Sequence, residues 1–461
     1  MSSSHRQVHL IAILGRTGHH AGSWRHPDAP IEPMMDIDWQ IAEAKRAEAA
    51  LLDALFVAEF YTGKNSALDT FSQLAAIAAE TSHIGLINTI ATVYNEPYHI
   101  ARFIASLDHL SKGRAGWNFV TGAGSAAHQF SRDGHPSHAD RYAQGDEAVD
   151  IIKRLWDSWE DGAILPVPER NLYVNQDRIH QINHTGQFYS VRGPLNLARP
   201  PQGHPVILQS GSSETGKEMA AKHGEAVYTA QQTLAAAKEF YIDLKGRLPK
   251  YGRSREDLLI LPGLAPLVAD TEKEALELEH ELNRYVDTRK ALNALSERFE
   301  VNLNDYDLDD PVPIDRAISE DTIDGIRSRH EAVLNPARRG TVTIRQLLYR
   351  SNAGHGHISL AGTPLQIADF IEEWFTSDAC DGFNLLPQVA PGSTHGFFDK
   401  VIPELQNRGL FRTAYEGTTL RESFGLKRPQ NRNSPRGAGS VGAAAAASSD
   451  SATSRYANAN L

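Results

Sequence analysis

Apolar residues recur along the chain with two different periods. Between positions 38 and 53 they return every three or four residues, as one face of a helix requires, at Ile41, Ala44, Ala47, Ala50 and Leu51. Shorter apolar runs are typical of buried strands, and we expect strands at 8–14, 54–58, 84–92, 115–121, 205–209, 226–229, 258–268 and 382–387. Because helical segments separate these eight runs, the pattern predicts an α/β fold, a (β/α)8 TIM barrel, rather than an open sheet.

Two insertions and a tail depart from this alternation. The first insertion, near 162–201, contains a hairpin-like sequence at 184–189, and the second, near 272–360, is charged and helix-rich with a basic stretch at 327–350. Insertions at the ends of barrel strands usually cover the active site. We therefore expect one barrel domain over 1–430. Residues 431–461 are rich in Asn, Ser, Gly and Ala, which predicts a disordered and dispensable tail.

Composition narrows the class of protein. Hydrophobic residues make up 41% and charged residues 22% of the chain, which is ordinary for a soluble globular protein. Apolar runs stay well below the roughly 18 residues of a spanning helix, and the start of the chain lacks the pattern of a secretory signal, so we expect a cytoplasmic protein. The single cysteine, Cys380, excludes an intramolecular disulfide, and a net charge of -11 disfavours nucleic acid or an anionic membrane as a partner.

The predicted strand at 115–121 ends in polar residues. Gly113 breaks the preceding segment, an apolar run follows, and Asn118 and Thr121 lie toward the strand's carboxyl end. In α/β folds ligands bind at the carboxyl ends of the strands. Asn118 is therefore a candidate binding residue.

The segment from Gly211 to Lys217 has the spacing of a phosphate-binding P-loop after a predicted strand. Glu218 stands where the magnesium-binding Ser or Thr of such a loop belongs, which argues against nucleotide hydrolysis. Small residues that lead into a helix still leave backbone N–H groups and a positive dipole end for a phosphate. The alternative is an N-capped helix without a ligand.

A second glycine pattern, G-x-G-x-x-A at 122–127, also follows a strand. The residues at 129–136 would break any helix within one or two turns, which argues against a Rossmann fingerprint. His128, His135 and His138 lie close in the sequence, but no H-E-x-x-H pattern accompanies them, and we expect no metal.

His138 and Tyr142 stand four residues apart at the start of a predicted long helix that reaches Trp159. This spacing puts both side chains on one face of the first turn, at the end that a barrel directs toward its ligand. Alone, such a pair is more often a pair of surface groups.

Taken together, the strand with Asn118, the sequence Asn-Glu-Pro-Tyr-His at 95–99 and the pair Arg141-Tyr142 resemble flavin-dependent monooxygenases of the bacterial luciferase-like superfamily. The resemblance is to the branch with nitrilotriacetate monooxygenase and dibenzothiophene sulfone monooxygenase. It covers roughly 7–429, with further motifs in the expected order at 18–25, 209–213, 408–412 and 415–422.

The resemblance implies roles for particular residues. It implies that Thr92 and Asn118 contact the flavin ring and that His138 and Tyr142 contribute to the flavin site, with His138 as a candidate general acid–base. Ser212 and Ser213 are implied to hold the flavin 5′-phosphate. Glu59 stands where the family usually carries an aspartate near the ring.

The implied activity is a two-component FMN-dependent monooxygenase. A separate NAD(P)H-dependent flavin reductase supplies reduced FMN, which forms a C4a-(hydro)peroxide with O2 and oxygenates a small organic substrate. A homodimer or homotetramer is expected. Two alternatives stay open, an F420-dependent oxidoreductase of the same superfamily and a non-catalytic flavin-binding protein.

Overall fold

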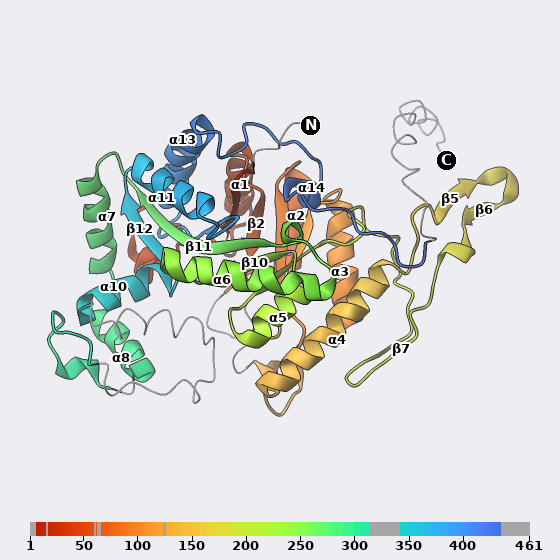
Figure 1. Ribbon diagram of the computed structural model, residues 1–461, viewed down its shortest axis with the longest axis horizontal. Helices are drawn as coiled ribbons and strands as arrows, with labels where there is room; N and C mark the ends of the chain where they lie inside the picture. The colour runs from red at the N-terminus through yellow and green to blue at the C-terminus, as the bar shows by residue number, and fades with distance from the viewer. Residues whose placement is uncertain are drawn as a thin grey trace, which may run out of the picture.

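The computed structural model describes residues 6–14, 17–59, 61, 66–122, 126–299, 301–313 and 342–434. Among these residues eight parallel strands close into a ring in the order β1 (His9–Ile13), β2 (Ala54–Val57), β3 (Gly85–Ala91), β4 (Ala115–Val120), β9 (Val206–Ser210), β10 (Ala226–Thr229), β11 (Leu259–Val268) and β13 (Gly382–Leu385). The ring closes where β13 pairs with β1 and β11 pairs with both β10 and β13. The predicted TIM barrel is confirmed (Figure 1).

One further parallel strand, β12 (Ile358–Gly362), was not predicted. It pairs with the second half of β11, where Ile358 lies opposite Leu264. The three central residues of β12 are only half-buried, so the strand lacks the continuous apolar run that marks the others. For this reason the first residues of β12 fell within the second insertion that we predicted from the sequence.

Helices cover the outside of the ring. They are α1 (Ile37–Ala49), α2 (Thr70–Glu80), α3 (Pro97–Leu110), α4 (His138–Trp156), α5 (Glu214–His223), α6 (Leu234–Arg247), α11 (Pro364–Thr376), α12 (Gly392–Gly396) and α13 (Ile402–Asn407), with a π-helical turn at Phe397–Val401. Trp156 of α4 packs edge-on against Trp117 of β4, with ring centroids 6.5 Å apart. In the part of the chain that the structure describes, no helix is long and apolar enough to cross a bilayer.

The first insertion consists of two hairpins. Strands β5 (Ile164–Val167) and β6 (Leu172–Val174) form an arm that projects from the barrel (Figure 1). The second hairpin pairs β7 (His184–Thr185) with β8 (Ser190–Val191), where the sequence predicted one.

The second insertion contains α7 (Glu272–Arg284), α8 (Thr288–Phe299) and α10 (Ile344–Gly354). Around α8 and α10 it builds an apolar cluster of its own, to which Leu295, Leu303 and Leu347 belong. Most of the basic stretch at 327–350 lies outside the described residues. Short 3-10 turns occur at Ser23–Arg25, Ala127–Phe130, Pro168–Arg170, Gln176–Arg178, Leu248–Tyr251, Arg255–Asp257 and Leu303–Asp305.

The amino-terminal end of the barrel is filled by the C-terminal segment. Leu420, which opens the short helix α14 (Leu420–Ser423), and Phe424 join the inward-facing residues of the strands in one apolar cluster. A Cβ atom at Gly85 would lie 2.5 Å from a methyl group of Leu420, and one at Gly116 would lie 3.2 Å away. Glycine at these two positions therefore makes room for the plug.

A buried carboxylate ties the same segment to the first strands. Asp53 is fully buried and accepts hydrogen bonds from the backbone N–H of Leu10 at 2.7 Å, from His9 at 3.1 Å and from the Arg412 guanidinium. Burial alone would raise the pKa of Asp53, but the charges of Arg412 and His9 hold that pKa below its ordinary value.

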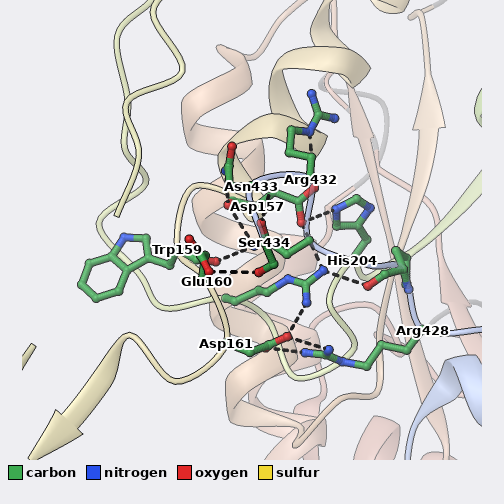
Figure 2. Close-up of polar contacts among 12 residues, drawn as sticks. Asp157, Trp159, Glu160, Asp161, His204, Arg428, Arg432, Asn433 and Ser434 are labelled. Atoms are coloured by element: carbon green, nitrogen blue, oxygen red, sulfur yellow. Dashed lines mark hydrogen bonds and ion pairs between the residues drawn. The ribbon is translucent and has the colours of Figure 1, made fainter. Parts of the chain in front are cut away.

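The first residues of the expected tail pack on the barrel. The part of the chain that contacts the barrel therefore continues past the predicted boundary at 430. Asn431 is only 6% exposed, and its amide donates to the carbonyl oxygens of Asp157 at 3.0 Å and Trp159 at 2.9 Å. Figure 2 shows Asn433 and Ser434 joining the same cluster. Composition did not reveal this contact because it is polar. Residues 435–461 lie outside the described residues.

We expect a chain that ends at Gln430 to be less stable than one that ends at Ser434. The shorter chain loses the hydrogen bonds to the carbonyl groups of Asp157 and Trp159, which costs about 1–3 kcal/mol. Thermal unfolding followed by circular dichroism should show a melting temperature a few degrees lower for the shorter chain, and a wild-type value for the longer one. Equal melting temperatures for both chains would show that the docked segment adds no stability.

We expect Arg412→Met to destabilise the protein by about 3–5 kcal/mol at neutral pH, because it leaves the Asp53 carboxylate buried without its main counterion. The pKa of Asp53 in the folded wild type is depressed, so the stability gained from its ionisation is present at neutral pH and lost as the pH falls. The difference in unfolding free energy between variant and wild type, measured in urea, should therefore shrink in acid.

Arg46→Met is the control for this substitution. Arg46 pairs with Asp399 on the surface, where both side chains are exposed, and such pairs contribute about 0–1 kcal/mol. A similar loss of stability in both variants would contradict a special role for the buried pair.

Candidate active site

Polar side chains of three adjacent strands meet inside the barrel near its carboxyl end. Asn118 of β4 is 2% exposed, and its amide donates to the Thr89 hydroxyl of β3 at 3.1 Å. The Ser210 hydroxyl at the end of β9 donates to the Asn118 amide oxygen at 3.0 Å. These hydrogen bonds hold the Asn118 side chain in place. They leave one N–H donor and one lone pair of its amide available for a further hydrogen bond.

The loop after β9 leads directly into α5. Ser213 is the N-cap of this helix, and its hydroxyl accepts from the backbone N–H of Gly216 at 3.1 Å. The Ser212 hydroxyl lies 2.9 Å from that of Thr229 at the end of β10. Ser212 and Ser213 thus stand at a helix N-terminus on the rim of the barrel, although Ser213 also performs the capping role that needs no ligand.

Lys217 does not serve the loop as the lysine of a P-loop would. Its ammonium group pairs with the carboxylates of Asp243 and Glu214. Glu218 likewise pairs with Lys250 and accepts from the Tyr251 hydroxyl. These ion pairs agree with the prediction that the segment does not hydrolyse nucleotides.

His138 and Tyr142 share the first turns of α4, as predicted. Helix α4 begins at His138, where Ser137 caps it, and the two rings lie 4.6 Å apart between centroids. A Cβ atom at Gly216 would be 3.4 Å from the Tyr142 hydroxyl, which places that hydroxyl over the loop that carries Ser212 and Ser213. Tyr142 and the two serines therefore converge, and His138 is the exposed member of the ring pair.

Thr92 and Glu59 lie on the neighbouring part of the rim. Thr92 is fully buried just after β3, and its hydroxyl is 3.5 Å from the carbonyl oxygen of Val120. Glu59 follows β2, and its carboxylate accepts from the Thr70 hydroxyl at 2.7 Å. Neither side chain joins the Asn118 chain of hydrogen bonds through a contact described in the structure.

An aromatic cluster beyond β3 was not predicted as part of the site. Tyr94 stacks on Phe130 with centroids 4.7 Å apart, and Tyr61 meets both rings edge-on. Asn95, part of a motif quoted from the sequence, donates to the Tyr61 hydroxyl at 3.1 Å. The residues come from three separate loops, so only the Asn95 motif signalled them.

A group of histidines lines the opposite side of the mouth. The His19 ring lies 4.9 Å from that of His355 and 6.2 Å from that of His357, between centroids. His357 stacks on Tyr228 of β10, and its Nε2 atom is 2.8 Å from the tyrosine hydroxyl. Sequence reasoning missed His355 and His357 because they precede β12, in the segment assigned to an insertion. Within the described residues no group of three His, Cys, Asp or Glu side chains could hold a metal ion.

Comparison with known proteins identifies the family of the chain. Residues 13–378 match the family described as luciferase-like monooxygenase. The chain is 46% identical to nitrilotriacetate monooxygenase component A from Aminobacter aminovorans, over 93% of this chain and 98% of that protein.

Two solved structures share the whole fold. One is EDTA monooxygenase from Chelativorans sp. BNC1, with a TM-score of 0.78, 31% identity, and coverage of 92% of this chain and 100% of that one. The other is a riboflavin lyase solved with modified FMN and riboflavin, with a TM-score of 0.78, 27% identity, and coverage of 92% and 97%. With its closed barrel, its polar rim and these full-length relatives, the chain belongs to the luciferase-like monooxygenase family and is a monooxygenase.

Proposed function

We propose that the chain is the oxygenating component of a two-component monooxygenase that uses reduced FMN and O2 to oxygenate a small organic substrate. The observation that carries the proposal is the convergence of the Asn118 hydrogen-bond chain, Tyr142 and the Ser212–Ser213 helix terminus on one rim of the barrel. Relatives of the same length are named as monooxygenases, and one is named as component A. The second component that fits this system is a separate NAD(P)H-dependent flavin reductase.

The rim offers a phosphate position and a ring position. The N-terminus of α5 with the Ser212 and Ser213 hydroxyls suits the single phosphate of FMN, because backbone N–H groups and the helix dipole both favour an anion there. Asn118, Thr92 and Glu59 stand at neighbouring strand ends, where they would contact the ring.

Buried polar atoms support this fit. Asn384 of β13 is fully buried, and neither its amide oxygen nor its amide nitrogen finds a hydrogen-bond partner among the described residues. Such a group normally has a partner, because leaving it unsatisfied costs about 1–3 kcal/mol. The edge of a flavin ring alternates donors and acceptors, so a ring in the barrel mouth would satisfy an amide.

The chain's own residues have two tasks. When bound, reduced FMN supplies the electrons that activate dioxygen. The aromatic cluster of Tyr61, Tyr94 and Phe130 would exclude water from the mouth, which prevents a reactive oxygen species from being discharged. His138, on the first turn of α4, is proposed to hold or move a proton, since imidazole titrates near neutral pH.

The deciding experiment offers the purified protein photoreduced FMN, reduced F420 or oxidised FMN and follows binding and oxygen consumption. Oxygenated product formed from an organic substrate with photoreduced FMN and O2, in the absence of NAD(P)H and not formed without the protein, supports the proposal, whereas oxygen consumption alone also occurs when free reduced FMN autoxidises. Tight binding of F420 with reduction of an organic acceptor supports the deazaflavin alternative. Binding of oxidised FMN without turnover would identify a flavin-binding protein without activity.

We expect Ser212→Asp to weaken FMN binding by about 1–3 kcal/mol, because it places a carboxylate against the phosphate. Quenching of FMN fluorescence on titration with protein measures the dissociation constant. Ser212→Asn is the matched control, since it has the same shape without the charge and loses the same contact with Thr229. If both variants bind FMN equally well, the phosphate does not lie beside residue 212.

We expect His138→Ala to uncouple the reaction while the protein stays folded. The side chain is exposed, so its removal opens no cavity in the core. With photoreduced FMN, O2 and an accepted substrate, the variant should release more hydrogen peroxide and less product than the wild type. His128→Ala, at an exposed position in the 3-10 turn Ala127–Phe130, is the control and should not change this ratio.

A further inference from the structure

A carboxylate of α4 binds the hairpin of β7 and β8 at three points. Glu147 accepts three hydrogen bonds from the hairpin, from His184 at 2.9 Å and from the backbone N–H groups of Phe188 and Tyr189 at 3.0 Å each. A Cβ atom at Gly186 would overlap the Glu147 carboxylate, so the turn of the hairpin needs glycine to approach this closely. In Figure 1 the hairpin lies beside α4.

The bonds at Glu147 are charge-assisted. Burial alone would raise the pKa of Glu147, but the hydrogen bonds from His184 and from the two backbone N–H groups lower that pKa below its ordinary value. The His184 ring is fixed from its other side, where Nδ1 lies 3.0 Å from the Arg154 guanidinium. The hairpin is therefore fastened to the third turn of α4 by groups that hold both its strands.

The hydrogen bonds at Glu147 hold Tyr189 at the rim of the barrel. Tyr189 is 9% exposed, and its hydroxyl accepts from the Gln144 amide at 2.9 Å and donates to the Thr92 carbonyl oxygen at 3.3 Å. Burial raises the pKa of Tyr189 to about 12, so the hydroxyl keeps the proton that it donates.

Thr92 is the point where the strand β3 gives way to the loop that bears the aromatic cluster. Its backbone N–H donates to the Val120 carbonyl at 3.0 Å on one side, and its carbonyl accepts from Tyr189 on the other. Two residues later Tyr94 begins the stacked cluster with Phe130. The Tyr189 hydroxyl thus holds the first residue of a segment that leads into the mouth.

We propose that Tyr189 is a positioning residue of the flavin site, which acts through Thr92 and is itself placed by Glu147. The proposal rests on the proposed function, because the segment at 92–95 matters for catalysis only if flavin binds at this rim. The second hairpin of the first insertion then supports the site from outside the barrel.

The first test uses Tyr189→Phe, which removes the hydroxyl and keeps the ring in the core. Losing one hydrogen bond of this kind should weaken the binding of photoreduced FMN about two- to tenfold and raise the fraction of O2 released as hydrogen peroxide. Tyr173→Phe is the matched control, because Tyr173 is 67% exposed on the neighbouring arm. Wild-type affinity and coupling in Tyr189→Phe would overturn the proposal.

The second test separates positioning from a merely structural role. If Glu147 acts through Tyr189, Glu147→Ala and the double variant with Tyr189→Phe should weaken FMN binding to the same extent, because the two losses are not additive. Glu147→Gln should restore part of the affinity, since it keeps one acceptor oxygen. Additive effects of the two substitutions on affinity would overturn the proposal.

The third test does not depend on flavin. Amide hydrogen exchange of the flavin-free protein, followed by mass spectrometry, should become faster in Tyr189→Phe for peptides that cover 92–95, and stay unchanged for peptides of β1. Unchanged exchange at 92–95 would overturn the proposal. A wild type that binds no flavin would refute the proposed function, while the exchange result would still decide whether Tyr189 holds this segment.

Discussion

Closure of the ring of eight parallel strands is the constraint on which the other features depend. A closed parallel barrel directs every strand the same way, so all carboxyl ends meet on one rim and alternate side chains point inward. At the opposite end, Leu420 and Phe424 fill the interior, and Gly85 and Gly116 provide the space for them. Because that end is filled with apolar side chains, the inward polar groups Thr89, Asn118 and Ser210 lie near the other end.

Helix α4 links this rim to the parts of the chain that surround the barrel. Its first turns carry His138 and Tyr142, its next turns carry Gln144 and Glu147, and Asp157 forms its C-cap. In a helix with 3.6 residues per turn, His138 and Tyr142 share one face, whereas Gln144 and Glu147 lie together on the opposite side. One rigid element therefore places the candidate flavin contacts, clamps the second hairpin and receives the docked C-terminal segment.

The sequence predicted what depends on local pattern and missed what depends on distant contacts. The strands of the ring follow from apolar runs, which are visible within a few residues. Strand β12 was missed because its central residues are half-buried, so no continuous apolar run marks it. The docking of Asn431 was missed because composition measures apolar content, whereas this contact is made of hydrogen bonds to the carbonyl groups of Asp157 and Trp159.

In the site, Asn118 shows the same contrast between local pattern and distant contacts. The position of Asn118 near a strand end indicated a binding role, but its hydrogen bonds to Thr89 and Ser210 join β4 to β3 and β9, and β9 follows far along the chain. Their pairing depends on the register of the closed sheet, which no short motif encodes. His355 and His357 reach the mouth for a similar reason, since they precede a strand that pairs with the distant strand β11.

The ion pairs of the α5 loop bear on how a flavin would be held. Lys217, the cation of the P-loop-like sequence, is engaged by Asp243 and Glu214 and so cannot also neutralise a phosphate at the start of the helix. A phosphate there would depend on backbone N–H groups, the helix dipole and the hydroxyls of Ser212 and Ser213, each of which contributes less than a full charge. Under the proposed function, moderate affinity would suit a cofactor that arrives reduced from another protein and leaves oxidised after each turnover. In a monooxygenase of this type, tight retention of oxidised FMN would instead block the next cycle.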